Sequence, residues 1–279
     1  MFLLMISFDS KFFNITDTLD CGQVFRFMPY KSGFLAFALD KVCYAKTVGN
    51  ETVIESDDDA FWRNYFDLDA PYETFASQIC GFSVPKLTFA CQKFSGIRIL
   101  NQSPYEALVS FIVSQNNNIP RIKSTIEKLC LNLGKPITFN GEVYHAFPTA
   151  EALASADERF FKSIGAGYRA EYLSKVAADI VSGKIDFDRL SALSTDALKS
   201  ELLLIKGVGN KVADCAVLFG FHRMDAFPVD TWIEKLYVED FGGTLKDRKK
   251  ISEYFVQKFG DLSGLAQQYL FHAKRKNLL

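Results

Sequence analysis

The sequence predicts an α+β fold in which an N-terminal antiparallel β lobe precedes a mostly helical body. Residues 1 to about 56 are rich in aromatic and β-branched residues that alternate with turn signals, as in strands joined by hairpins. From about residue 100, apolar residues recur at helical spacing. No repeat or low-complexity segment interrupts the 279 residues. We therefore expect two domains, residues 1–100 and residues 101–279.

In the N-terminal lobe, the stretches 33–37 and 42–48 are expected as strands because aromatic and β-branched residues lie there between turns. The apolar opening, residues 1–6, is interpreted as a first strand. It lacks the basic residues of a signal peptide and is too short to span a membrane. Three aspartates, Asp57–Asp59, precede an expected helix at 60–66, where their charge favours the helix N-terminus.

The helical body is expected to begin at a capping box, Ser103-Pro104-Tyr105-Glu106, with proline in the first helical position. A second helix is expected at 120–133, with one apolar stripe, and Gly134 and Pro136 end it. Further helices are expected at roughly 150–163, 168–182, 195–204, 210–221, 230–240, 247–259 and 262–276.

Composition and cysteine spacing restrict the possible functions. The chain is 48% hydrophobic and 23% charged with a net charge of −1, so any affinity for nucleic acid has to come from a local basic face. The six cysteines, at positions 21, 43, 80, 91, 130 and 215, form no Cys-x-x-Cys pair and no metal-binding spacing. We therefore expect free thiols in a reducing cell interior, with no metal ion and no cofactor.

One stretch concentrates the features that indicate a binding site. Residues 202–215 are interpreted as a helix, a tight turn at Gly207-Val208-Gly209 and a second helix. Glycine lets the turn approach another molecule closely, and the free N–H groups of the second helix suit an anion such as a DNA phosphate. Lys211 lies just past the turn. Further along, Asp230 follows Pro228 and takes the N-cap position of a third helix.

This pattern resembles the helix-hairpin-helix, Gly-Pro-Asp superfamily of DNA base-excision glycosylases. Its members carry a hairpin of the form apolar-x-Gly-Val-Gly, a lysine two residues later and Val-Asp after a proline, and all these parts are present here in order. The resemblance implies a two-lobed helical body. Because Lys211 is present, it also implies a bifunctional enzyme, which removes a base and cuts the strand.

The resemblance makes Lys211 and Asp230 the candidate catalytic residues. An exposed lysine is usually only solvated. Here a neutral amine would attack C1′ of a nucleotide, and the adjacent helix N-terminus and partial burial both disfavour the ammonium form. Asp230 would stabilise the positive charge that develops as the base leaves, a role compatible with an N-cap. Cys215, one turn beyond Lys211, would line the base pocket; a small core residue is the alternative.

Two loops resemble the segments of 8-oxoguanine DNA glycosylases that face the cytosine opposite the lesion. Asn116 and Arg121 lie in the run Ser-Gln-Asn-Asn-Asn-Ile-Pro-Arg, which simple turn chemistry would also explain. The Gly-Tyr-Arg-Ala turn implies that Tyr168 fills the gap left by the flipped base and that Arg169 bonds the cytosine. Its formal match to G-x-G-x-x-A does not indicate a dinucleotide site, because a helix is expected before it where that site needs a strand.

Two further elements resemble the same family. Gly22, in the element Gly-Gln-x-Phe-Arg, would offer its carbonyl to the N7–H of 8-oxoguanine, which guanine lacks; without the family it would be interpreted as a turn residue. The amphipathic C-terminal helix would place Gln267 on the Watson–Crick edge of the base and Phe271 on its face, with core packing as the alternative. Two residues depart from animal members: Trp232 replaces a histidine near the phosphate, and Phe219 replaces a methionine by the pocket.

These features predict an enzyme that removes 8-oxoguanine opposite cytosine from double-stranded DNA through a Schiff base on Lys211 and nicks the strand by β-elimination. The alternatives are an alkylated-base glycosylase of the same superfamily, which would lack this lysine, and a non-catalytic DNA-binding hairpin protein. We expect a monomer with no membrane segment, and no iron–sulfur cluster because no cysteine follows Cys215. An intracellular location is expected: the cytoplasm or nucleoid of a bacterium, or the nucleus of a eukaryote.

Overall fold

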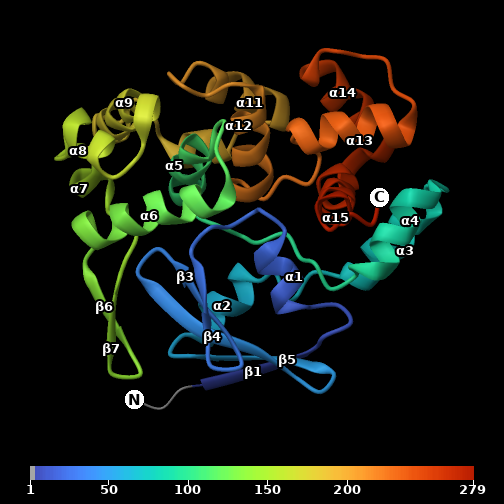
Figure 1. Ribbon diagram of the computed structural model, residues 1–279, viewed down its shortest axis with the longest axis horizontal. Coiled ribbons are helices and arrows are strands. Elements are labelled where there is room, and N and C mark those ends of the chain that lie inside the picture. Colours follow the sequence, from blue (N-terminus) through green and yellow to red (C-terminus); the bar gives the residue numbers. More distant parts are fainter. Residues whose placement is uncertain (1–3) are drawn as a thin grey trace.

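The computed structural model describes residues 4–279 and confirms the predicted α+β architecture (Figure 1). The N-terminal lobe contains a five-stranded antiparallel sheet in the order β1-β5-β4-β3-β2. Both predicted strands are present, and β1 contains the described part of the opening run; residues 1–3 lie outside the described residues. The strands are β1 (Leu4–Asp9), β2 (Phe27–Tyr30), β3 (Gly33–Ala38), β4 (Lys41–Val48) and β5 (Glu51–Ser56).

The central strands of this sheet are buried on both faces, and alternate residues meet different neighbours. Ala36 and Ala45 face a cluster that includes the fully buried Trp62. Phe37 faces the opposite way, toward Tyr144 of a second, two-stranded sheet. The elements on the two faces are α1 (Ile15–Asp20) and α2 (Asp59–Tyr65) on one, and the hairpin of β6 (Pro136–Phe139) and β7 (Glu142–His145) on the other.

The helical body follows the expected order with several additions (Figure 1). Its helices are α5 (Pro104–Ser114), α6 (Ile119–Leu133), α7 (Ala150–Ala154), α8 (Glu158–Ser163), α9 (Ala170–Val181), α10 (Phe187–Ser191), α11 (Thr195–Leu203), α12 (Asn210–Cys215), α13 (Thr231–Phe241), α14 (Arg248–Phe259) and α15 (Ser263–Arg275). Short turns of other helix types complete it: η1 (Gly167–Arg169), η2 (Ala216–Gly220, a π-helical turn) and η3 (Gly260–Leu262).

The body divides into two lobes on either side of α11 and α12 (Figure 1). One lobe contains α6 to α9, and the other contains α13 to α15. Two helices that the sequence analysis did not identify, α3 (Tyr72–Gly81) and α4 (Pro85–Lys93), join the second lobe, where α4 packs against α15. Because these helices precede residue 100 and pack against the end of the chain, the expected domain boundary near residue 100 stays a prediction.

The capping box expected at Ser103 is wrong. Ser103 does precede α5, but its side chain makes no capping hydrogen bond. The Glu106 carboxylate instead accepts a hydrogen bond from the backbone N–H of Leu39 at 2.7 Å and lies 3.5 Å from Arg26. A buried carboxylate needs such partners, so Glu106 connects the helical body to the β lobe rather than closing its own helix.

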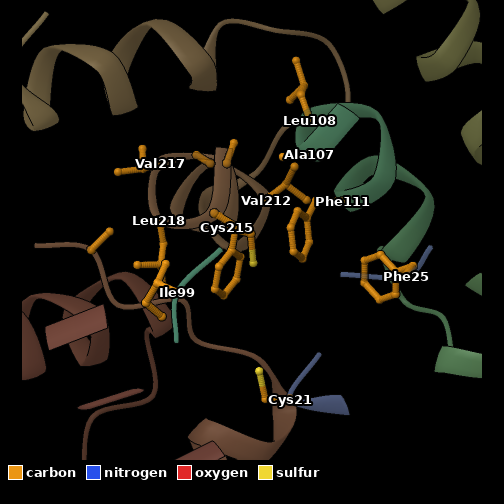
Figure 2. Close-up of a cluster of buried hydrophobic side chains, with 14 of the residues drawn as sticks. Cys21, Phe25, Ile99, Ala107, Leu108, Phe111, Val212, Cys215, Val217 and Leu218 are labelled. Atoms are coloured by element: carbon orange, nitrogen blue, oxygen red, sulfur yellow. The ribbon is translucent and has the colours of Figure 1, made fainter. Parts of the chain in front are cut away.

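Other helix predictions were correct in position but not always in extent. α2 begins where the aspartates predicted it, with the Asp58 side chain accepting a hydrogen bond from the Phe61 N–H at 3.0 Å. The expected helix at 150–163 is divided into α7 and α8, and the one at 210–221 changes to π-helical geometry after Cys215. Around η2, α5 and α12 pack closely, and Phe111, Val212 and Cys215 lie in one buried cluster (Figure 2).

Candidate active site

A cavity of about 980 Å³ lies where the β lobe, both helical lobes and the hairpin meet. This volume is within the range of sites that enclose a small organic group. Segments far apart in the sequence form its wall, from the turn after α1 to the last turn of α15. Of the residues singled out from the sequence, those that line it are Gly22, Asn116, Tyr168, Gly209, Lys211, Asp230, Trp232 and Phe271.

The hairpin between α11 and α12 has the tight turn that its glycines indicated. Gly207 has a φ of +86°, and a Cβ there would overlap the ring of Tyr172, so the position requires glycine. Val208 is buried beneath the turn, whereas Gly209 is exposed and serves as the N-cap of α12. The start of α12, from Gly209 to Lys211, lines the cavity, and the first N–H groups of a helix have no partner within it.

Lys211 lies in the first turn of α12, half-buried in the cavity wall. Its Nζ donates to the hydroxyl of Ser114 at 3.0 Å and lies 4.9 Å from the ring centroid of Phe111. Ser114 in turn donates its proton to the carbonyl of Phe111 at 2.8 Å, so its oxygen is free to accept from the lysine. These contacts from α5 hold the amine at the cavity surface.

Asp230 is the N-cap of α13, as predicted. Its Oδ1 accepts from the backbone N–H groups of Trp232 at 3.0 Å and Ile233 at 2.9 Å. Asp230 also lines the cavity in whose wall Lys211 of α12 lies. Trp232, the departure noted in the sequence, is 39% exposed at the same rim.

Three other sequence-predicted site residues are buried beside the cavity and do not line it. Burial raises the pKa of the Cys215 thiol to about 12, although the charge of Lys211 opposes the rise. Phe219 stacks on Phe111 with ring centroids 5.3 Å apart. Gln267 donates to the carbonyl of Pro228 at 3.3 Å, next to the loop that carries the N-cap aspartate. Core packing, the alternative considered for Cys215 and Gln267, thus describes their surroundings in the free protein.

The N-terminal turn and the C-terminal helix meet at Gly22. Its φ is +84°, and a Cβ there would lie 3.0 Å from Cε1 of Phe271. Arg275, one turn further along α15, donates to the carbonyl of Asp20 at 2.7 Å and to its carboxylate at 3.0 Å. The turn after α1 and the C-terminal helix α15 therefore form one wall of the cavity.

Arg169 joins the turn that carries it to the loop that carries Asn116, through the carbonyls of Gln115 and Asn116. Arg169, which is 5% exposed, donates from Nε to the Gln115 carbonyl at 2.7 Å and from Nη2 to the Asn116 carbonyl at 3.0 Å. Tyr168 is 53% exposed at the cavity. Arg121 is exposed and lies outside the cavity wall. In the free protein, Arg169 therefore holds the loop rather than facing the cavity.

Ser114 and Gln115 are site residues that the sequence analysis did not single out. The Gln115 side chain donates to the carbonyl of Gly207 at 2.8 Å, which connects the hairpin to the asparagine loop. Both residues stand in the quoted run beside the asparagines, but nothing in their local pattern indicates contact with a hairpin about 90 residues away. Only their position at the end of a buried helix could have suggested a role.

Among residues 4–279, no group of three or more histidine, cysteine or acidic side chains is arranged to hold a metal ion. In the same part of the chain, none of the helices combines the length and apolar character needed to cross a membrane.

Comparison with known proteins agrees with this geometry. Residues 5–108 match the N-terminal domain of 8-oxoguanine DNA glycosylase, and residues 109–261 match the HhH-GPD superfamily of base excision DNA repair proteins. A probable N-glycosylase/DNA lyase of Methanothermobacter thermautotrophicus is 31% identical over 77% of this chain and 74% of its own length. The N-glycosylase/DNA lyase of Saccharomyces cerevisiae is 41% identical over 55% of this chain and 44% of its own.

A solved structure extends the similarity to the whole chain. The Clostridium acetobutylicum 8-oxoguanine glycosylase/lyase, in complex with double-stranded DNA containing cytosine opposite 8-oxoguanine, is 34% identical. The two structures match with a TM-score of 0.92 over 100% of both chains. The chain therefore belongs to the 8-oxoguanine DNA glycosylase/lyase family, within the HhH-GPD superfamily of base excision DNA repair proteins.

Proposed function

We propose that this protein excises 8-oxoguanine from double-stranded DNA opposite cytosine and then nicks the abasic strand. The observation that carries the proposal is that Lys211 and Asp230 line one cavity, with the amine held by Ser114. A base flipped out of the duplex needs such a cavity to bring its sugar to the reactive groups. Family membership supports the same reaction.

In this mechanism, Nζ of Lys211 forms a bond to C1′ as the bond from C1′ to the base breaks. The sugar ring then opens to give a Schiff base. Loss of a proton from C2′ expels the 3′ phosphate, which nicks the strand. Asp230 stabilises the positive charge on the sugar while the base leaves, because a fixed carboxylate is already oriented by the helix that it caps.

The remaining residues form the binding surface in this proposal. The backbone of Gly207, Val208 and Gly209 holds a DNA phosphate at the start of α12. Tyr168 enters the space that the flipped base leaves, and Asn116 reaches the estranged cytosine with Arg121 and Arg169. Around the base itself, the contacts are made by Gly22, Cys215, Phe219, Gln267 and Phe271.

The proposal is tested by mixing the protein with DNA that contains 8-oxoguanine opposite cytosine, in the presence of borohydride. Reduction of the Schiff base should give a covalent protein–DNA complex. A monofunctional alkylated-base glycosylase would release its base without trapping, and a non-catalytic hairpin protein would bind DNA without releasing any base. Either result would overturn the assignment.

Gly22→Ala tests how the lesion is distinguished from guanine. A carbonyl at Gly22 would accept from N7–H of 8-oxoguanine but would face a lone pair on guanine. An added Cβ would crowd Phe271, the proposed stacking partner of the base. Because this crowding should move the base off the Gly22 carbonyl, we expect excision to fall relative to nicking of a preformed abasic site. An unpaired N7–H would account for a fall of roughly 5- to 150-fold. The ratio of the two rates is the measurement.

The matched control is Gly141→Ala. Gly141 has a φ of +83°, almost the same as that of Gly22, but a Cβ there would have nothing within 4 Å. This variant carries the backbone strain without the crowding, so its rate ratio should stay at the wild-type value. An unchanged ratio in Gly22→Ala as well would mean that Gly22 is only a turn residue.

Arg169→Ala tests the reading of the opposite base. Cytosine offers acceptors at O2 and N3, so loss of the guanidinium should reduce excision opposite cytosine by about 10- to 150-fold, the usual cost of losing hydrogen bonds to a charged group. Excision opposite adenine should fall less. Equal losses on the two pairs would show that Arg169 only holds the Gln115 and Asn116 carbonyls, as it does in the free protein.

The protein works as a monomer, since one chain supplies all of the residues assigned to the reaction. It uses no cofactor, because the Lys211 amine itself is the nucleophile that attacks C1′. It holds no iron–sulfur cluster in this proposal, because its six cysteines lack the spacing of cluster ligands. Its substrate implies a location with the chromosome, in the nucleoid of a bacterium or the nucleus of a eukaryote.

A further inference from the structure

Asp214 is a buried charge next to the active site that the proposed mechanism does not use. It lies on α12, three residues after Lys211, and is 2% exposed. Its Oδ1 lies 2.5 Å from Nζ of Lys199 on α11, whose side chain is 20% exposed. Burial raises the pKa of Asp214 to about 6, although Lys199 opposes the rise. Burying a carboxylate lowers the stability of the folded protein unless its partners compensate, so a role for Asp214 beyond packing is expected.

Asp214 stands in the wall between two cavities. Besides the active-site cavity, a second cavity of about 480 Å³ lies on the other side of α12, bounded by α11 and α14. Within residues 4–279, Asp214 is the one residue that lines both. The polar contacts of Asp214 therefore act on the part of α12 that separates the two cavities.

The contacts of Asp214 extend to the segment that carries Asp230. The hydroxyl of Ser252 on α14, which is 2% exposed, lies beside Asp214 in the lining of the second cavity and opposes the rise in the pKa of that carboxyl. The same hydroxyl donates to the carbonyl of Phe227 at 2.8 Å. Phe227 stands three residues before Asp230, on the segment that leads into the N-cap. Asp214 therefore lies on the helix that carries Lys211 and beside the hydroxyl that holds the segment leading to Asp230.

We propose that Asp214, with Lys199 and Ser252, is a positioning network that sets the amine of Lys211 relative to the carboxylate of Asp230. The inference rests on the function proposed above. Residues three apart on a helix are neighbours on its surface. The ion pair of Asp214 with Lys199 of α11 therefore fixes the rotation of α12 about its axis, and with it the direction of Lys211. Precise placement matters because a shift of about 1 Å at a reacting group can reduce a rate by roughly 100-fold.

The test compares Asp214→Asn with Asp179→Asn. Asp179, on α9, is also a buried helix carboxylate, with Lys175 at 2.7 Å, but it lies outside the cavity. For each variant we would measure the single-turnover excision rate, the Kd for DNA with a tetrahydrofuran abasic analogue, and the Tm. Asp214→Asn should lower excision and borohydride trapping by roughly 10- to 100-fold at an unchanged Kd, well below its Tm. Asp179→Asn should lower the Tm without changing the rate.

A second pair of variants keeps the test decisive if Asp214→Asn does not fold. Lys199→Met removes the ion pair, whereas Lys199→Arg preserves it. The arginine variant should recover most of the rate that the methionine variant loses, and a purely structural pair would change the Tm alone. Wild-type rates in Asp214→Asn, or in Lys199→Met, would overturn the network. Absence of trapping by the wild type would overturn the proposed function instead, so the two failures are distinguishable.

Discussion

Lys211→Gln is expected to bind DNA containing 8-oxoguanine but to lose both base excision and borohydride trapping. Glutamine keeps the polarity and much of the length of lysine, so the contact with Ser114 can persist, but its amide is not a nucleophile. Loss of a nucleophile typically reduces a rate on the order of 10⁴- to 10⁶-fold. Single-turnover excision and gel detection of the trapped complex would measure the two losses.

Lys206→Gln is the matched control. Lys206 lies on the same hairpin, on the other side of the Gly207 turn, where it is exposed and paired with Glu171. Any loss of phosphate binding from one fewer positive charge would be overcome at saturating DNA. This variant should therefore still trap at the wild-type rate. Retained trapping in Lys211→Gln would falsify the assignment of the nucleophile.

Asp230→Asn is expected to keep lesion binding and to lose about 100- to 1,000-fold in turnover, the usual effect of removing one preorganised electrostatic group. The substitution separates the two roles of this side chain. Asparagine caps a helix about as well as aspartate, so it can still accept from Trp232 and Ile233, while the negative charge is gone. Affinity, single-turnover rate and Tm would be measured on the same preparation.

Asp247→Asn is the control for the cap. Asp247 caps α14 by accepting from the Lys249 N–H at 2.8 Å, and it lies outside the cavity wall. Loss of charge at this cap should change the Tm slightly and leave excision unchanged. If Asp230→Asn lowers the affinity and the Tm together and the rate falls only in proportion, Asp230 is chiefly a structural cap.

Local chemistry explains why the sequence was sufficient for much of the site. A glycine at positive φ, an aspartate at a helix start and a lysine after a hairpin act through their own backbone neighbours, so a pattern over a few residues predicts them. The turn at Gly207, the acidic helix start at Asp57–Asp59, the N-cap Asp230 and the position of Lys211 just past the turn were all predicted in this way. Strands and most helices followed from periodicity for the same reason.

Contacts between distant segments needed the tertiary structure, because sequence patterns carry no information about which buried groups meet. Glu106 fits the sequence pattern of a capping residue, but its carboxylate pairs with Arg26 of the β lobe, since a buried charge takes the partner that the fold supplies. Arg169 matches a base-reading motif but binds carbonyls of the neighbouring loop in the free protein.

The sequence by itself determined the fold class, the family and the chemical groups available for the reaction, since these depend on short-range patterns. The tertiary structure alone decided how those groups are arranged: that Ser114 holds the Lys211 amine, that Gln115 joins the hairpin to the asparagine loop, and that Asp214 lies between two cavities. Each of these contacts depends on packing between helices far apart in the chain, and packing is a property of the whole fold.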